Sequence, residues 1–159
     1  MPTPTSSPTP RPLGTRRLAN GITVTITDHS RRLAGDRWHL RVEFLVRVAD
    51  ETARQCLARI APQHLDSGSL PAWERLIVRE RHFVDEHSLD ELRQAMLDDF
   101  DRSLTPYLAS PRSPERLVAE RLRDWRPPAP GGTAAPYAHL DADDGPADFS
   151  FLFRNQKGE

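Results

Sequence analysis

Two histidines and a glutamate lie close together in the second half of the chain, and these side chains are common metal ligands. His82, Glu86 and His87 follow the pattern H-x-x-x-E-H. Zinc hydrolases place two histidine ligands one helical turn apart, together with a glutamate that activates the zinc-bound water. On a strand, however, His82 and His87 would point to opposite faces. We therefore expect a polar turn before a helix at this position, and we predict neither a metal site nor a cofactor.

The segment from Leu18 to Val24, LANGITV, carries an Asn-Gly pair between apolar residues. It resembles the opening hairpin of the inverted-zincin (pitrilysin-like) metallopeptidases. This resemblance implies a zinc ion held by H-x-x-E-H on a helix and by a distant carboxylate. The pattern at His82 is one residue longer than that motif and lies well downstream of the place where the family has it. The resemblance covers only the hairpin, so we do not predict zinc hydrolysis.

Other candidate catalytic residues belong to incomplete motifs. Cys56 is the only cysteine and lies at helical spacing among apolar residues, so we expect it in the core. The acidic run 141–145 starts like a calcium-binding loop, but Leu152 stands where the twelfth-position acid is required. The chain has no nucleophile elbow, no phosphate-binding glycine loop and no paired-cysteine motif. The sequence therefore contains no complete catalytic motif, and we favour a non-enzymatic protein over the alternative of an enzyme whose site is assembled from residues far apart in the sequence.

One face of the strand that we predict at residues 38–48 is better suited to binding a partner. His39, Arg41 and Arg47 share this face, because side chains alternate along a strand. Guanidinium and imidazole groups there could receive an acidic partner or a phosphate backbone. Further arginines flank the strand at positions 31, 32 and 37. The alternative interpretation is an ordinary solvated face.

The C-terminal segment is the second candidate for binding. Phe149, Phe151 and Phe153 lie at period two after an acidic run, and half of the six phenylalanines are in these five residues. Aromatic residues at this spacing are typical of a peptide that adds itself to the edge of a sheet. We expect this segment either to dock on the sheet edge of its own domain or to bind another protein.

The charge of the chain helps to rank protein binding above nucleic-acid binding. The chain has 21 arginines and one lysine, yet its net charge is −1 and its pI is about 6.6. Nucleic-acid-binding domains usually have a pI above about 9. Residues 11–47 carry a net charge of +5, whereas 50–126 and 127–159 each carry −3. Our first hypothesis is a non-enzymatic interaction or regulatory module, and our second is nucleic-acid binding with the acidic tail as an internal competitor.

The hydrophobic pattern predicts an α+β fold. Period-two alternation predicts strands at 22–27 and 38–48, separated by a basic loop at 28–37, and a short hairpin at Asn20-Gly21. Helical spacing predicts helices at 50–61, 88–105 and 113–126, with Ser88 and Glu91 forming a capping box and Ser113 as an N-cap. Residues 72–84 fit a strand better than a helix. The expected order is β-β-α-β-α-α, a small antiparallel sheet of about three strands with helices on one face.

Composition divides the chain into three parts. Residues 1–12 are rich in Pro, Thr and Ser and predict a disordered arm, residues 13–126 form the single domain, and 127–159 make a Pro/Gly linker and an acidic tail. No apolar run is long enough to span a membrane, and the N-terminus lacks the apolar region of a signal peptide. We expect a cytoplasmic protein.

Overall fold

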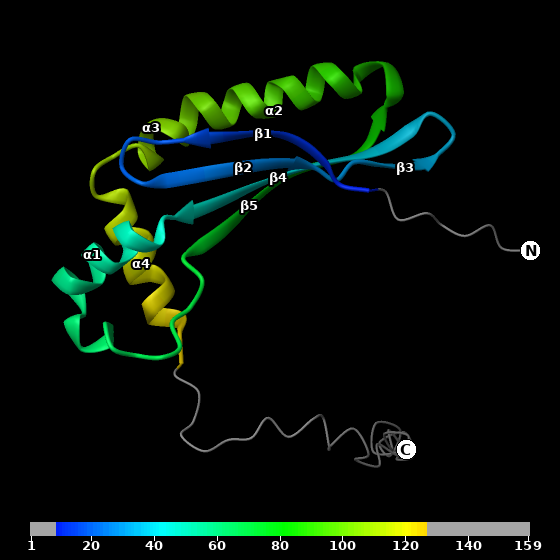
Figure 1. The fold of residues 1–159 in the computed structure, drawn as a ribbon. Coiled ribbons are helices and arrows are strands. Elements are labelled where there is room, and N and C mark those ends of the chain that lie inside the picture. Colours follow the sequence, from blue (N-terminus) through cyan, green and yellow to red (C-terminus); the bar gives the residue numbers. More distant parts are fainter. Residues whose placement is uncertain (1–8, 127–159) are drawn as a thin grey trace, which may run out of the picture. The chain divides into compact units, whose positions relative to one another are not determined.

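A five-stranded antiparallel sheet forms the framework of residues 9–126, the part of the chain that the computed structural model describes (Figure 1). The strands are β1 (Arg11–Arg17), β2 (Ile22–Asp28), β3 (Arg31–Ala34), β4 (Arg37–Val48) and β5 (Glu74–Asp85). The helices are α1 (Asp50–Ile60), α2 (Leu89–Ser103), the four-residue α3 (Thr105–Leu108) and α4 (Ser113–Asp124), and 3-10 turns lie at Pro62–His64 and Glu86–Ser88. The α+β class expected from the sequence is confirmed.

β4 is the central strand of the sheet. It pairs with β2 and β3 along one edge and with β5 along the other, while β1 lies outside β2 (Figure 1). The ring of Phe44 stacks on Phe100 of α2 with 4.1 Å between centroids. Alternate side chains of β4 share one face, and the buried ones are Leu40, Val42, Phe44, Val46 and Val48. The core strand is therefore placed as its alternation predicts.

The prediction of about three strands is wrong, because the sheet has five. The basic loop expected at 28–37 contains β3, which pairs with the start of β4 across a turn at Gly35. The seven-residue β1 pairs with β2 at six positions and begins at Arg11, within the stretch that composition assigns to an arm. Both strands are largely exposed. Backbone pairing holds them in place, so no apolar alternation marks them in the sequence.

Two ion pairs fix α2 to the buried face of the sheet. Arg93 Nε lies 2.7 Å from Asp28 Oδ2 of β2, and the two side chains are 12% and 6% exposed. Nearer the outer strand, Arg16 Nη2 of β1 lies 2.7 Å from Asp101 Oδ2, and these side chains are 39% and 40% exposed. α2 is therefore tied to the β1–β2 side of the sheet by charge as well as by the packing of Phe100.

α1 and α4 pack on each other at the end of the sheet where β4 finishes (Figure 1). Arg75 Nη1 of β5 lies 3.2 Å from Glu120 Oε2 of α4. At the hairpin between β1 and β2, Asn20 Nδ2 donates hydrogen bonds to the carbonyl oxygens of Leu108, at 2.7 Å, and Ser110, at 2.9 Å. The Asn-Gly turn predicted from the sequence therefore also joins the sheet to the segment that links α3 and α4.

The helices form near their predicted positions, but their first turns differ from the prediction. Ser88 has helical dihedrals at the end of a 3-10 turn and makes no side-chain cap, so the expected capping box with Glu91 is absent. Ser113 is the first residue of α4 rather than its N-cap, because its hydroxyl donates to the carbonyl of Tyr107. The strand favoured for 72–84 is confirmed as β5.

Candidate functional site

Polar side chains gather at the centre of the sheet face opposite α2, which we call the open face. His39 and Arg41, two of the residues singled out from the sequence, both lie here on β4. Arg41 is held by Glu43, whose Oε1 lies 2.9 Å from Nε and 2.7 Å from Nη2. Glu43 Oε2 is also 3.1 Å from His29 Nε2. The guanidinium of Arg41 is therefore neutralised by a neighbouring carboxylate.

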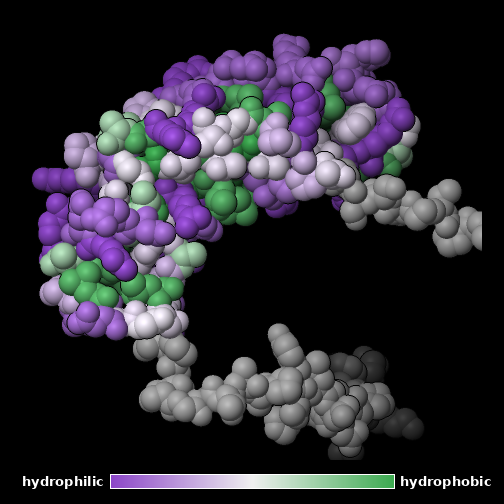
Figure 2. Space-filling view, viewed as in Figure 1, coloured by the Kyte–Doolittle hydropathy of each residue, from purple (hydrophilic) through white to green (hydrophobic). Residues whose placement is uncertain are grey.

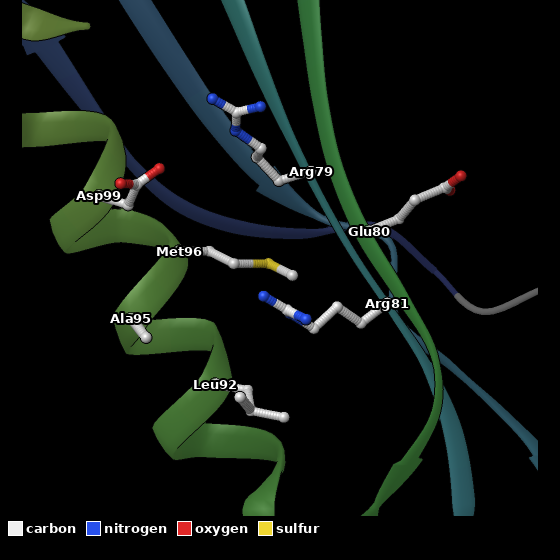
Figure 3. Close-up of a pocket in the computed structure, with 7 residues that line it drawn as sticks. All are labelled: Arg79, Glu80, Arg81, Leu92, Ala95, Met96 and Asp99. Carbon is white, nitrogen blue, oxygen red and sulfur yellow. The ribbon is translucent and has the colours of Figure 1, made fainter. Parts of the chain in front are cut away.

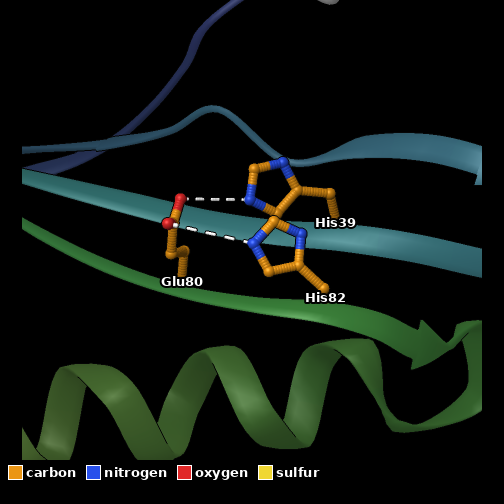
Figure 4. Close-up of side chains that lie close together, drawn as sticks. All are labelled: His39, Glu80 and His82. Carbon is orange, nitrogen blue, oxygen red and sulfur yellow. Dashed lines mark hydrogen bonds and ion pairs between the residues drawn. The ribbon is translucent and has the colours of Figure 1, made fainter. Parts of the chain in front are cut away.

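Glu80 of β5 joins this network to a pair of histidines. Its Oε2 lies 3.1 Å from His39 Nε2 and 3.4 Å from Arg41 Nη1, and its Oε1 lies 3.9 Å from His82 Nε2. The imidazoles of His39 and His82 stack with 4.3 Å between centroids and 7° between planes. Figure 4 shows both Nε2 atoms turned toward Glu80, while the second nitrogen of each ring faces away from it.

The backbone explains this arrangement. Glu80 and His82 are two residues apart on β5, so their side chains share one face. The β4–β5 register shifts where Trp38 pairs with Val84 but Leu40 pairs with Arg81, which leaves two β5 residues opposite His39. Such a bulge re-aims side chains. The extra residue is Phe83, which has a φ of 58°.

The other residues predicted for partner binding do not join this cluster. Arg47 lies 3.8 Å from Asp50 Oδ1 and 3.7 Å from Glu74 Oε1, toward the end of the sheet. The flanking arginines 32 and 37 also have carboxylate neighbours. A nucleic-acid backbone would have to displace these carboxylates. The candidates Phe149, Phe151 and Phe153 lie outside the described residues.

A groove between β5 and α2 lies on the opposite side of β5. It contains a cavity of about 320 Å³. In Figure 3, Arg79 and Arg81 point from β5 toward α2, Leu92 and Met96 line the helix side, and Glu80 points away. Within residues 9–126, neither Arg79 nor Arg81 has a carboxylate oxygen within 4.0 Å. These two guanidinium groups are therefore available to an acidic ligand.

β5 also exposes apolar side chains. Figure 2 shows a largely hydrophilic surface in which hydrophobic residues emerge as separate patches. Phe83 is 73% exposed and Leu76 is 50% exposed, and both belong to β5. These apolar side chains lie on the strand whose outer edge is unpaired among the described strands.

Sequence reasoning missed Glu80, Arg79 and Arg81 as binding residues, and it paired His82 with His87 rather than with His39. The spacing Glu80-x-His82 on a predicted strand was the available signal, because it places both side chains on one face. The partner on β4 depends on the register between two strands that are far apart in the sequence.

The chain matches no model of a known protein family, no curated protein and no solved structure. None of the described helices is long and apolar enough to cross a membrane. Function is therefore inferred from the arrangement of this chain's own residues.

Proposed function

We propose that this protein is an interaction module that binds an extended peptide by adding it as a strand to the free edge of β5. The free edge of β5 is the observation that supports this proposal. All twelve residues of β5 belong to a strand that, among the described strands, pairs with β4 alone. The unpaired N–H and C=O groups of an edge strand are a template for another chain, and several peptide-binding domains use them in this way.

The groove beside the edge favours a particular peptide chemistry. Arg79 and Arg81 favour carboxylates, and their guanidinium groups also suit the faces of aromatic rings. Leu92 and Met96 supply apolar surface on the α2 side. Side chains of an added strand alternate, so every second residue would face this groove. The expected ligand is an extended peptide that combines acidic residues with aromatic residues at period two.

The chain itself contains a sequence of this chemistry. Phe149, Phe151 and Phe153 occupy alternate positions, and Asp148 and three earlier aspartates precede them. A synthetic peptide of residues 145–156 is therefore the probe that fits the proposal. The same chemistry in another protein would be recognised in the same way.

Fluorescence anisotropy of the labelled peptide tests the proposal. The receptor is the full-length chain with F149D, F151D and F153D together, because these changes remove the chain's own competing sequence. We expect saturable binding by this chain. Adding R79E and R81E should weaken binding by roughly tenfold or more, since both favourable charges become repulsive.

A charge-matched control separates the groove from net charge. R112E and R123E make the same charge change on exposed arginines outside the groove and should leave peptide binding unchanged. The proposal is wrong if the peptide does not bind, or if the R79E/R81E variant binds it as well as the R112E/R123E variant does.

The nucleic-acid hypothesis is decided by the same assay with a labelled oligonucleotide. The carboxylates beside Arg41 and Arg47 lead us to expect no binding at physiological salt. Oligonucleotide binding that falls steeply with salt, together with no peptide binding, would support that hypothesis instead.

A further inference from the structure

We propose that His39, Glu80 and His82 bind a divalent transition-metal ion of the zinc class on the open face of the sheet. The ligand atoms are the two Nε2 atoms and a carboxylate oxygen of Glu80, and all of them lie within 4.8 Å of one another. Two imidazoles and one carboxylate are the protein ligands of many zinc sites that keep a further position for water. This site is independent of the peptide groove, because Glu80 points away from that groove (Figure 3).

The separations are close to those that a metal requires. Ligands of a tetrahedral zinc ion lie about 2.0–2.2 Å from the metal and therefore roughly 3.4 Å from one another. His39 Nε2 and Glu80 Oε2 are 3.1 Å apart, which already satisfies this condition. His82 Nε2 is 3.9 Å from Glu80 Oε1, and its ring, which is stacked nearly parallel to that of His39, must turn so that both nitrogen lone pairs point at one ion. Its side chain is 59% exposed and has room to do so.

One of the three proposed ligand side chains is buried and held in place, and the other two are exposed and can adjust. The His39 side chain is 9% exposed, so the sheet holds its ring in place. Glu80 and His82 are 41% and 59% exposed, which leaves the site open to ions from solvent. The bulge at Phe83 is what places His82 against His39. A bulge with a bulky residue at positive φ costs stability and is often found beside a functional site.

The neighbouring charges decide which ions can bind. Arg41 Nη1 lies 3.4 Å from Glu80, so a hard cation that depends on carboxylate charge would compete poorly. Transition metals bind imidazole nitrogen strongly and need less help from charge. Arg41 also keeps its closer contacts with Glu43 when Glu80 turns to a metal. The chemistry therefore selects Zn²⁺, Cu²⁺ or Ni²⁺ over Ca²⁺ and Mg²⁺.

Titration of the full-length chain with ZnCl₂ by isothermal calorimetry tests this site. We expect one zinc ion per chain at a site that H82A and E80Q each weaken by at least about tenfold. Both substitutions change exposed side chains, and circular dichroism confirms that the variants fold. H87A is the matched control, because His87 belongs to the same sequence pattern but lies outside the cluster; its zinc affinity should equal that of the unmodified chain.

Cobalt gives a second readout, since Co²⁺ bound by two imidazoles and a carboxylate shows visible absorption that H82A should abolish. The inference is overturned if the unmodified chain binds no zinc at millimolar concentration. It is also overturned if H82A and E80Q bind zinc as tightly as H87A does, because the ion would then occupy other ligands.

Discussion

Among the described strands, β1, the four-residue β3 and β5 are outer strands, and the free edges of the two longer ones, β1 and β5, differ. β1 has seven residues, contains Pro12, and shifts its register with β2 between Pro12 and Gly14. A proline without an N–H and a local bulge are two ways in which proteins block pairing with another chain. β5 has twelve residues and no proline, and its register with β4 shifts only near its end. The edge that we propose as the template for a partner is therefore that of β5 rather than that of β1.

The contacts of α2 show the same difference. α2 forms ion pairs with β2 through Arg93 and with β1 through Asp101. Within the described residues it forms none with β5, although Asp99 lines the same cavity as Arg79 and Arg81. The groove between α2 and β5 therefore lies on the side of α2 that forms no described ion pair with the sheet. We therefore place the proposed binding edge on β5, which contains no proline and which no described ion pair joins to α2.

The ion pairs of α2 offer the largest expected effect on stability. R93M leaves the nearly buried Asp28 carboxylate without its cation, and we expect it to lower the free energy of unfolding by about 3 kcal/mol. R16M removes an exposed pair and should cost less than about 1 kcal/mol. Urea denaturation of the two variants measures both values. Equal losses would show that the buried pair is not what fixes α2 to the sheet.

A smaller change in the free energy of unfolding, in the stabilising direction, is expected from a substitution near the end of β5. Phe83 has a φ of 58°, in the left-handed region that glycine adopts without strain, and its side chain is 73% exposed. F83G should raise the free energy of unfolding by about 1 kcal/mol, because strain is lost with little packing. Thermal and urea unfolding measure the change. A loss of stability in F83G would mean that the strain at this position is smaller than the cost of the extra backbone freedom that glycine gives to the unfolded chain.

The regular, buried part of the fold could be predicted from the sequence. β4 and the three longer helices bury a periodic apolar side, and that periodicity is visible in the residues. β1 and β3 could not be found this way, because exposed strands are held by backbone bonds that leave no side-chain pattern. The capping box failed for a different reason: Asp85 accepts from the amide of His87, and a 3-10 turn at 86–88 precedes the helix.

The sequence predicts only the β4 residues of the polar cluster on the open face. His39 and Arg41 share a face by strand periodicity alone, so they could be predicted. Glu80 and His82 meet them only through the register of β4 and β5, which are separated by α1 and a connecting segment. Register is set by the packing of the whole sheet and by the bulge at Phe83. The residue pattern of a single sequence does not indicate this register or this bulge.

Hydrogen exchange measured on the full-length F149D/F151D/F153D chain, with and without the peptide of residues 145–156, decides whether the peptide joins the sheet at β5. An added strand engages the free N–H groups of the edge that it joins. We predict slower amide exchange in residues 74–85 when the peptide is present, and unchanged exchange in residues 11–17 at the protected edge. Slower exchange in residues 11–17, or no change in residues 74–85 at a saturating peptide concentration, would contradict the assignment of β5 as the binding edge.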